Sequence, residues 1–167
     1  RIINNYPKGR QQSAVMPVLD LAQRQNKGWL TKNIIEKVAE TLNMSFIRVM
    51  EVASFYSMFN LEPVGKNFIQ ICRTTPCWLR GSNKLLEVAK NVTGCNLGET
   101  SKDNKFTLVE VECLGACCNA PMIQINDDYY EDLTEENFKQ LLLKLKENKR
   151  INTGSQIGRL NSEPKRK

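Results

Sequence analysis

Residues 71–77 read Ile71-Cys72-Arg73-Thr74-Thr75-Pro76-Cys77, and residues 112–117 read Glu112-Cys113-Leu114-Gly115-Ala116-Cys117. Each stretch follows a run with the composition of a β-strand, so both cysteine pairs are expected in loops at strand ends. The chain has six cysteines and no histidine, so any site for a soft metal must be all-thiolate. Such a site holds either a structural zinc ion or an iron-sulfur cluster.

A disulfide framework is the competing use of these thiols. Six cysteines in 167 residues are sparse for a disulfide-stapled secreted domain, and no stretch resembling a secretory signal precedes them. Redox exchange between thiols is also disfavoured, because the sequence lacks a Cys-x-x-Cys motif.

The spacing of the four cysteines favours a cluster over zinc. The gaps are four, thirty-five and three residues, whereas structural zinc sites usually repeat a shorter knuckle in both halves. A 2Fe-2S cluster needs two thiolates on each of two irons, and a four-residue loop is long enough to wrap it. The small residues Gly115 and Ala116 would let the backbone approach a sulfide closely. Spacing alone leaves both kinds of site open.

Longer stretches around the cysteines closely resemble the thioredoxin-like 2Fe-2S subunits of NADH:quinone oxidoreductase, respiratory complex I. They are Cys72-Arg-Thr-Thr-Pro-Cys77-Trp-Leu-Arg-Gly-Ser82, Phe106-Thr-Leu-Val-Glu-Val-Glu-Cys113-Leu-Gly-Ala-Cys117-Cys-Asn-Ala-Pro-Met122 and Gln124-Ile-Asn-Asp-Asp-Tyr-Tyr-Glu-Asp-Leu-Thr134. The resemblance extends back to Gly9-Arg-Gln-Gln-Ser-Ala14 and Glu51-Val-Ala-Ser-Phe-Tyr-Ser-Met-Phe59, and so covers nearly the whole chain.

This resemblance implies an electron-transfer subunit of the NADH dehydrogenase module. It implies one 2Fe-2S cluster, with Cys72, Cys77, Cys113 and Cys117 as its ligands. The cluster would exchange one electron with the FMN of a partner subunit, which alone binds FMN and NADH. The isolated chain is then expected to catalyse nothing, although the complex is an oxidoreductase and translocase that reduces quinone.

The resemblance also implies a place in the cell. Through the NADH-binding partner the chain would join the peripheral arm of the complex. That arm lies on the cytoplasmic face of a bacterial inner membrane or the matrix side of a mitochondrial one. Two alternatives remain: the equivalent ferredoxin subunit of an NAD-linked hydrogenase or formate dehydrogenase, and a structural four-thiolate zinc module.

The expected architecture is α/β, with an N-terminal helical bundle followed by a thioredoxin-like 2Fe-2S ferredoxin domain. Residues 1–61 show helical periodicity, with Thr31 and Ser45 as candidate N-caps. Residues 65–149 would form the second domain, in the order strand, helix, three strands, helix. Ser82 and Thr134 are the candidate caps of its helices.

Features near the strand ends complete this expectation. A hairpin is expected at Asn126-Asp127. Pro121 occupies the place where thioredoxin-like folds commonly carry a cis proline, and the sequence does not decide its isomer. Cys95 is expected to be a small apolar filler and Cys118 an unreactive thiol, although Cys118 directly follows a proposed ligand. For the aromatic stretch 55–59, core packing and a docking surface are both open interpretations.

Charge is concentrated at the C-terminal end. The net charge is +6, and residues 144–167 carry eight Lys and Arg against Glu147 and Glu163. Residues 150–167 are therefore expected to form an extended basic tail that is disordered in isolation. The stretch Gly154-Ser-Gln-Ile-Gly-Arg159, followed by Ser162-Glu-Pro164, resembles the C-terminal extension of the same family, and this resemblance implies that the tail orders along the partner on assembly. Nucleic-acid binding is not expected, because no recognition motif accompanies the basic residues. Direct membrane insertion is not expected either, because no apolar run approaches the roughly 18 residues of a span.

Overall fold

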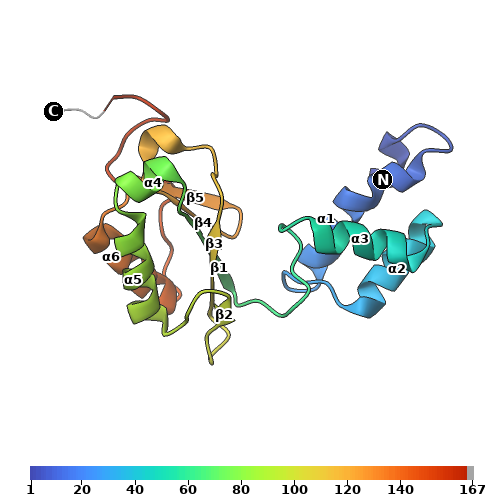
Figure 1. Cartoon of the computed structure of the whole chain (residues 1–167), viewed down its shortest axis with the longest axis horizontal. Helices are drawn as coiled ribbons and strands as arrows, with labels where there is room; N and C mark the ends of the chain where they lie inside the picture. The colour runs from blue at the N-terminus through green and yellow to red at the C-terminus, as the bar shows by residue number, and fades with distance from the viewer. Residues whose placement is uncertain (165–167) are drawn as a thin grey trace. The chain divides into compact units, whose positions relative to one another are not determined.

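The computed structural model describes residues 1–164, which belong to two compact units (Figure 1). The first unit is Arg1–Val64 and the second begins at Gly65. The division falls next to Pro63, where the helical pattern of the sequence is interrupted.

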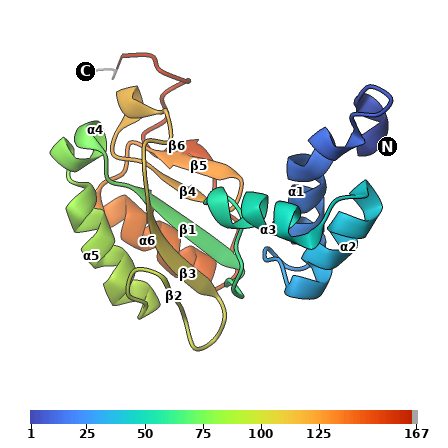
Figure 2. The same ribbon diagram turned by 45° about the vertical axis from the view of Figure 1, so that its right-hand side comes forward.

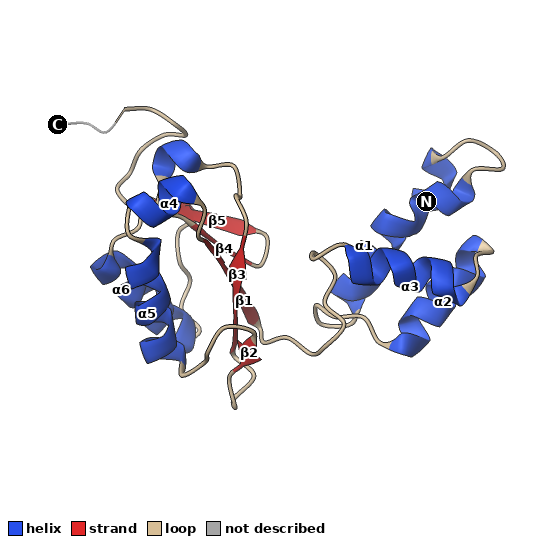
Figure 3. Ribbon diagram, in the orientation of Figure 1, coloured by secondary structure: helices blue, strands red, loops and turns tan. Residues whose placement is uncertain are grey.

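The first unit contains helices and loops only (Figure 3). Its elements are the 3-10 helices η1 (Ile2–Asn5) and η2 (Gln11–Ala14) and the helices α1 (Val15–Gln25), α2 (Lys32–Leu42) and α3 (Phe46–Phe55). The Thr31 hydroxyl accepts a hydrogen bond from the Ile34 amide at 3.2 Å, which confirms the predicted N-cap of α2. Ser45 occupies the N-cap position of α3, but its side chain makes no capping bond. Leu19, Ile35 and Val49 are buried where the three helices pack together.

The second unit is built on one six-stranded sheet. Its strands are β1 (Asn67–Cys72), β2 (Glu99–Thr100), β3 (Phe106–Val111), β4 (Ile123–Ile125), β5 (Asp128–Glu131) and β6 (Gly154–Ser155), in the spatial order β2-β3-β1-β4-β5-β6. β1 and β3 are parallel neighbours, so the chain leaves both strands at the same edge of the sheet. β4 and β5 form the predicted hairpin around Asn126-Asp127.

Three helices complete this unit: α4 (Thr75–Leu79), α5 (Ser82–Thr93) and α6 (Glu135–Lys146). α5 and α6 lie side by side on one face of the sheet (Figure 2). Thr134 and Asn137 form a capping box at the start of α6, as predicted for Thr134. The predicted cap at Ser82 is wrong, because Gly81 takes the N-cap position with φ of 97° and Ser82 is a buried residue of the first turn. Glycine adopts that backbone conformation without steric cost.

The core of the second unit lies between the sheet and these two helices. Ile69, Leu108, Ile123, Phe138 and Leu142 are each fully buried in it. Cys95 is 2% exposed in the same core, which agrees with its predicted role as an apolar filler. The bond between Ala120 and Pro121 is cis.

The C-terminal segment is more structured than its sequence-based description. Gly154 and Ser155 form β6, which pairs in parallel with Tyr130 and Glu131 of β5. Backbone pairing does not depend on apolar side chains, so this segment can join the sheet without them. The last three basic residues, 165–167, lie outside the described residues. No helix among residues 1–164 has the length and apolar character needed to cross a membrane.

Candidate metal centre

Parallel pairing of β1 with β3 brings the two cysteine loops together. Cys72, the last residue of β1, lies in register with Val111, the last residue of β3. Cys113 follows only two residues later. Cys77 lies in α4, and Cys117 begins the 3-10 helix η3 (Cys117–Asn119). Thiols that are distant in sequence thus share one edge of the sheet.

The four thiols are arranged as two pairs. The Sγ atoms of Cys113 and Cys117 are 3.4 Å apart, and Cys72 and Cys77 each shift the pKa of the other. The pairs differ in their surroundings, because Cys72 and Cys77 are each 1% exposed whereas Cys113 and Cys117 are exposed.

Thr74 connects the two pairs. Its hydroxyl lies 3.3 Å from the Sγ atom of Cys72. The same side chain also hydrogen-bonds to Cys113. The charge of Cys72 also acts to raise the pKa of Cys113, and the charge of Cys117 acts to raise that of Cys77.

The pKa values of the thiols differ within the buried pair. Burial would raise the pKa of Cys72, but hydrogen bonds from Thr74, Leu114 and Cys77 outweigh it and lower that pKa. Burial raises the pKa of its partner Cys77 to about 12. In this pair the pKa of Cys72 is therefore lowered and that of Cys77 is raised.

The exposed pair repeats this asymmetry. The backbone amide of Gly115 and the side chain of Cys117 lower the pKa of Cys113. The hydrogen bond to Cys113, together with desolvation, raises the pKa of Cys117. Binding of a metal displaces the protons of all thiols that are still protonated, since only thiolates are good ligands.

The donor set consists of two thiol pairs at the same end of the parallel strands β1 and β3. A 2Fe-2S cluster takes two thiolates on each of its two irons, and two thiol pairs fit that requirement.

Comparison with known proteins agrees with this geometry. Residues 1–146 match the family described as thioredoxin-like [2Fe-2S] ferredoxin. The chain belongs to this family. The predictions of a thioredoxin-like ferredoxin fold and of a 2Fe-2S cofactor are thereby confirmed, and the ligand residues stay a prediction.

Named relatives are similar over most of the ferredoxin chain. An NADH-quinone oxidoreductase subunit of Rickettsia bellii is 57% identical over 145 residues, which are 87% of each chain. The mitochondrial NADH dehydrogenase [ubiquinone] flavoprotein 2 of Dictyostelium discoideum is 52% identical over 163 residues, which are 98% of this chain and 66% of that protein.

A solved structure shares the fold of this ferredoxin. It is that of an NAD+-reducing [NiFe]-hydrogenase in the air-oxidized state, with a TM-score of 0.69 and 18% identity. The alignment covers 78% of this chain and 23% of that chain.

A tyrosine of β5 holds the loop that carries Cys113 and Cys117. The Tyr129 hydroxyl donates a hydrogen bond to the Leu114 carbonyl at 2.7 Å. Leu114, Ala116 and Tyr129 also pack against the small buried cluster that contains Cys72 and Cys77. Gly115, with φ of 89°, allows the tight turn between the two exposed cysteines.

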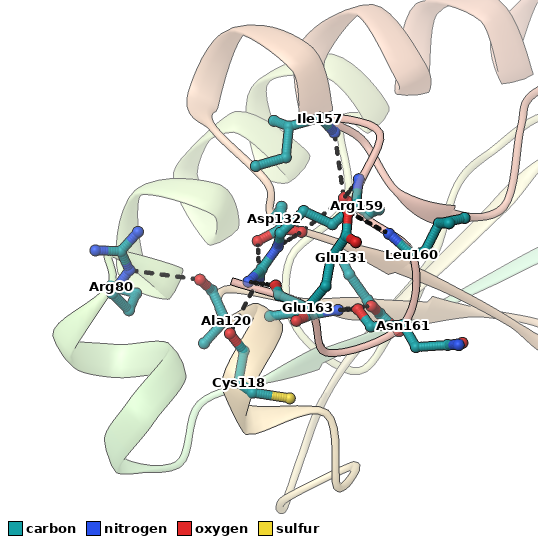
Figure 4. Close-up of polar contacts among 12 residues, drawn as sticks. Arg80, Cys118, Ala120, Glu131, Asp132, Ile157, Arg159, Leu160, Asn161 and Glu163 are labelled. Carbon is teal, nitrogen blue, oxygen red and sulfur yellow. Dashed lines mark hydrogen bonds and ion pairs between the residues drawn. The ribbon is translucent and has the colours of Figure 1, made fainter. Parts of the chain in front are cut away.

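Two features of this ferredoxin site were not predicted from the sequence. The Cys72 loop contains the one-turn helix α4, for which Pro76 near its start is a helix-initiation signal. The C-terminal segment contacts the turn at Cys118 and Asn119, and no local sequence signal marks these contacts (Figure 4). Cys118 is exposed, and its backbone carbonyl takes part in those contacts.

Proposed function

We propose that this ferredoxin is the electron-transfer subunit of the NADH dehydrogenase module of complex I. One observation carries the proposal: two thiol pairs meet at the ends of the parallel strands β1 and β3. The relatives' names supply the complex in which such a ferredoxin works. The partner would be the subunit that binds FMN and NADH, and through it the rest of the peripheral arm. The chain would then lie on the cytoplasmic or matrix side of the membrane.

In this proposal Cys72 and Cys77 bind one iron, and Cys113 and Cys117 bind the other. When bound, the cluster supplies outer-sphere transfer of a single electron. The chain itself supplies the electrostatic environment. The Thr74 hydroxyl and the Gly115 amide both contact ligand sulfurs and stabilise negative charge there.

Replacing Thr74 with valine should lower the reduction potential of the cluster. The isosteric change removes the hydroxyl that contacts Cys72 and Cys113. A hydrogen bond to sulfur favours the more negative, reduced cluster, so its loss favours the oxidised one. A difference of about 1 kcal/mol between the two states corresponds to roughly 40 mV for one electron.

A potentiometric titration followed by electron paramagnetic resonance (EPR) measures this shift. Thr75→Val is the matched control, because no hydrogen bond from the Thr75 hydroxyl to a ligand sulfur is found among the described residues. An unchanged or raised potential in Thr74→Val would contradict the assigned role of the hydroxyl.

The first unit presents apolar side chains that a partner subunit would cover. Phe55 is 79% exposed at the end of α3, and Tyr56 and Met58 follow at 40% and 54%, whereas Phe59 is buried. Phe55 and Tyr56 also stack edge to face. Phe59 therefore packs in the core, whereas docking stays a proposal for Phe55, Tyr56 and Met58, because exposed aromatic residues of this kind are typical of binding hot spots.

Replacing Phe55 with serine should weaken binding to the NADH-binding subunit by about tenfold or more. Leu21→Ser is the matched control, because Leu21 is an exposed apolar residue of α1 outside this stretch. Biolayer interferometry with the purified partner measures both affinities. Equal affinities for the wild type and Phe55→Ser would show that this surface is not part of the interface.

The second candidate function is the equivalent subunit of an NAD-linked hydrogenase or formate dehydrogenase. The observation that favours this alternative is the fold that the chain shares with the NAD+-reducing hydrogenase. Affinity purification of the tagged chain from its own cells, with the partners identified by mass spectrometry, separates the two. Complex I subunits in stoichiometric amounts support the proposal, and hydrogenase or formate dehydrogenase subunits support the alternative.

Electron exchange is tested on the complex with its flavin subunit. The isolated ferredoxin is reduced with dithionite, freed of excess reductant and mixed anaerobically with the partner that carries oxidised FMN. Loss of the cluster signal is expected together with a partial decrease of the flavin absorbance that corresponds to one electron per cluster. Stable coexistence of reduced cluster and oxidised flavin in the assembled complex would contradict the proposed exchange.

A further inference from the structure

The segment 154–163 is attached to the ferredoxin unit through β5. Gly154 and Ser155 pair with that strand, and the Gln156 amide continues the pairing by donating to the Glu131 carbonyl at 2.9 Å. Residues 154–163 lie beyond the 146 residues that match the family. The residues of this segment that contact the ferredoxin unit therefore lie outside the region that matches the family.

Arg159 anchors this segment on Asp132, the residue that follows β5. Its Nε atom donates to Oδ2 of Asp132 at 3.0 Å and its Nη2 atom donates to Oδ1, so the guanidinium grips the carboxylate with two bonds. The two side chains are only 11% and 9% exposed. The Ser155 hydroxyl donates a further hydrogen bond to Asp132 at 2.6 Å. Bidentate pairs of this kind, shielded from water, fix side-chain geometry.

The charge of Asp132 is preserved in this setting. Burial acts to raise the pKa of its carboxyl group, but hydrogen bonds from Arg159 and Ser155 and the positive charges of Arg159 and Arg80 outweigh it and lower that pKa. The pair therefore stays ionised at neutral pH.

From this anchor the segment reaches the turn that carries Cys117. The Nη2 atom of Arg159 donates to the Cys118 carbonyl at 3.0 Å (Figure 4). The side chain of Asn119, which is 2% exposed, donates to the Asn161 carbonyl at 2.6 Å. The Asp132 amide donates to the Asn119 carbonyl at 2.8 Å. Both residues that follow Cys117 are thus held from the side of the C-terminal segment.

The turn has little internal support of its own. η3 spans three residues, and its own backbone bonds are those of Asn119 to Ala116 and of Ala120 to Cys117, at 3.0 and 3.3 Å. Two adjacent thiols, Cys117 and Cys118, are both exposed there. Adjacent residues of a 3-10 helix point about 120° apart, so Cys118 can face Cys113 in place of Cys117 only if this short turn unwinds or rotates as a whole.

We propose that Arg159, held by Asp132, is a positioning residue that selects Cys117 over Cys118 as the partner of Cys113. Its bond to the Cys118 carbonyl fixes the peptide between Cys118 and Asn119. This bond also fixes the orientation of the backbone that carries the thiols of Cys117 and Cys118. This inference rests on the proposed assignment of Cys117 as a cluster ligand.

The test uses the full chain with its cluster. Arg159→Gln removes the charged guanidinium, and Arg159→Lys keeps the charge. Arg150→Gln, at an exposed residue of the same C-terminal part of the chain, is the control for loss of one positive charge. Iron release to a chelator should be about tenfold faster in Arg159→Gln, the scale expected when a residue supporting a ligand is lost. Arg159→Lys should recover part of this loss, and Arg150→Gln should behave as wild type.

A spectroscopic readout separates positioning from general stability. In Arg159→Gln the EPR spectrum of the reduced cluster should contain two species, because Cys118 competes with Cys117. Adding Cys118→Ser should restore a single species while release stays fast. A single wild-type spectrum and wild-type release rate in Arg159→Gln would overturn the proposal. General unfolding would instead appear as a lowered melting temperature that Cys118→Ser leaves unchanged, without a second spectral species, and would also overturn it.

A measurement on the metal-free chain separates this inference from the proposed function. Brief alkylation with iodoacetamide, mapped by mass spectrometry, reports the relative accessibility of Cys117 and Cys118. Arg159→Gln should change their ratio by severalfold, and an unchanged ratio would contradict the positioning role even if the cluster binds. A wild-type chain that binds no 2Fe-2S cluster, together with a changed ratio in Arg159→Gln, would refute the proposed function and leave Arg159 as the residue that orients the turn.

Discussion

Replacing Cys117 with alanine is expected to leave the purified chain without a stable 2Fe-2S cluster. In the proposed assignment the change removes one of the two thiols on one iron, and the bond from Arg159 to the Cys118 carbonyl would keep Cys118 from replacing it. Losing a direct ligand should cost more than the roughly 10–100-fold in affinity that losing a ligand's hydrogen-bond partner costs. Iron content and visible absorbance after anaerobic purification measure the effect.

Cys118→Ala is the matched control for this variant. It removes a second exposed thiol, one residue away, and should keep full iron content and the wild-type spectrum. The reverse result, with the cluster lost in Cys118→Ala and kept in Cys117→Ala, would show that the ligand is Cys118. If both variants kept the cluster equally well, neither thiol of this turn would be a required ligand.

Replacing Gly65 with alanine is expected to destabilise the ferredoxin unit by about 3 kcal/mol. A Cβ atom at this position would lie 2.7 Å from the backbone N and C atoms of Phe106. These atoms belong to β3, which is paired on both sides and cannot move away cheaply. The Gly65 amide also donates to the Thr107 hydroxyl at 2.6 Å, a bond that the displaced backbone would lose.

Urea unfolding followed by circular dichroism measures this loss. Lys66→Ala, a change at the neighbouring exposed residue, is the control and should stay within about 0.5 kcal/mol of wild type. Wild-type stability in Gly65→Ala would mean that the close approach of Gly65 to β3 is not maintained in solution.

Local sequence signals predicted most of the second unit. Strand composition located β1 and β3, and their parallel pairing followed from the expected thioredoxin topology. The cap at Thr134 was predictable because a capping residue and its bonding partner lie within one turn of each other. The meeting of the cysteine pairs was predictable for a similar reason, since each pair directly follows a parallel strand.

Features that depend on distant contacts were not predictable. Arg159 lies in a polar stretch without periodicity, and its role requires Asp132, which is far away in the sequence. Phe55 and Phe59 have the same side chain and lie four residues apart, yet one is exposed and the other buried. The amino-acid composition does not indicate which aromatic residue becomes buried when the chain folds.

The residues of the site were recognisable, whereas their environment was not. Four cysteines indicate a soft-metal site by their chemistry alone. The unequal pKa values of Cys72 and Cys77 instead arise from burial and from hydrogen bonds that only the folded chain creates.

Low-temperature EPR on the anaerobically purified chain, before and after reduction with dithionite, tests the central claim most directly. Iron and zinc are quantified in the same sample. The expected result is a silent oxidised sample with two irons per chain, which on reduction gives a rhombic or axial signal approaching one spin per two irons. Stoichiometric zinc without a reducible signal would contradict the electron-transfer account and identify a structural metal module.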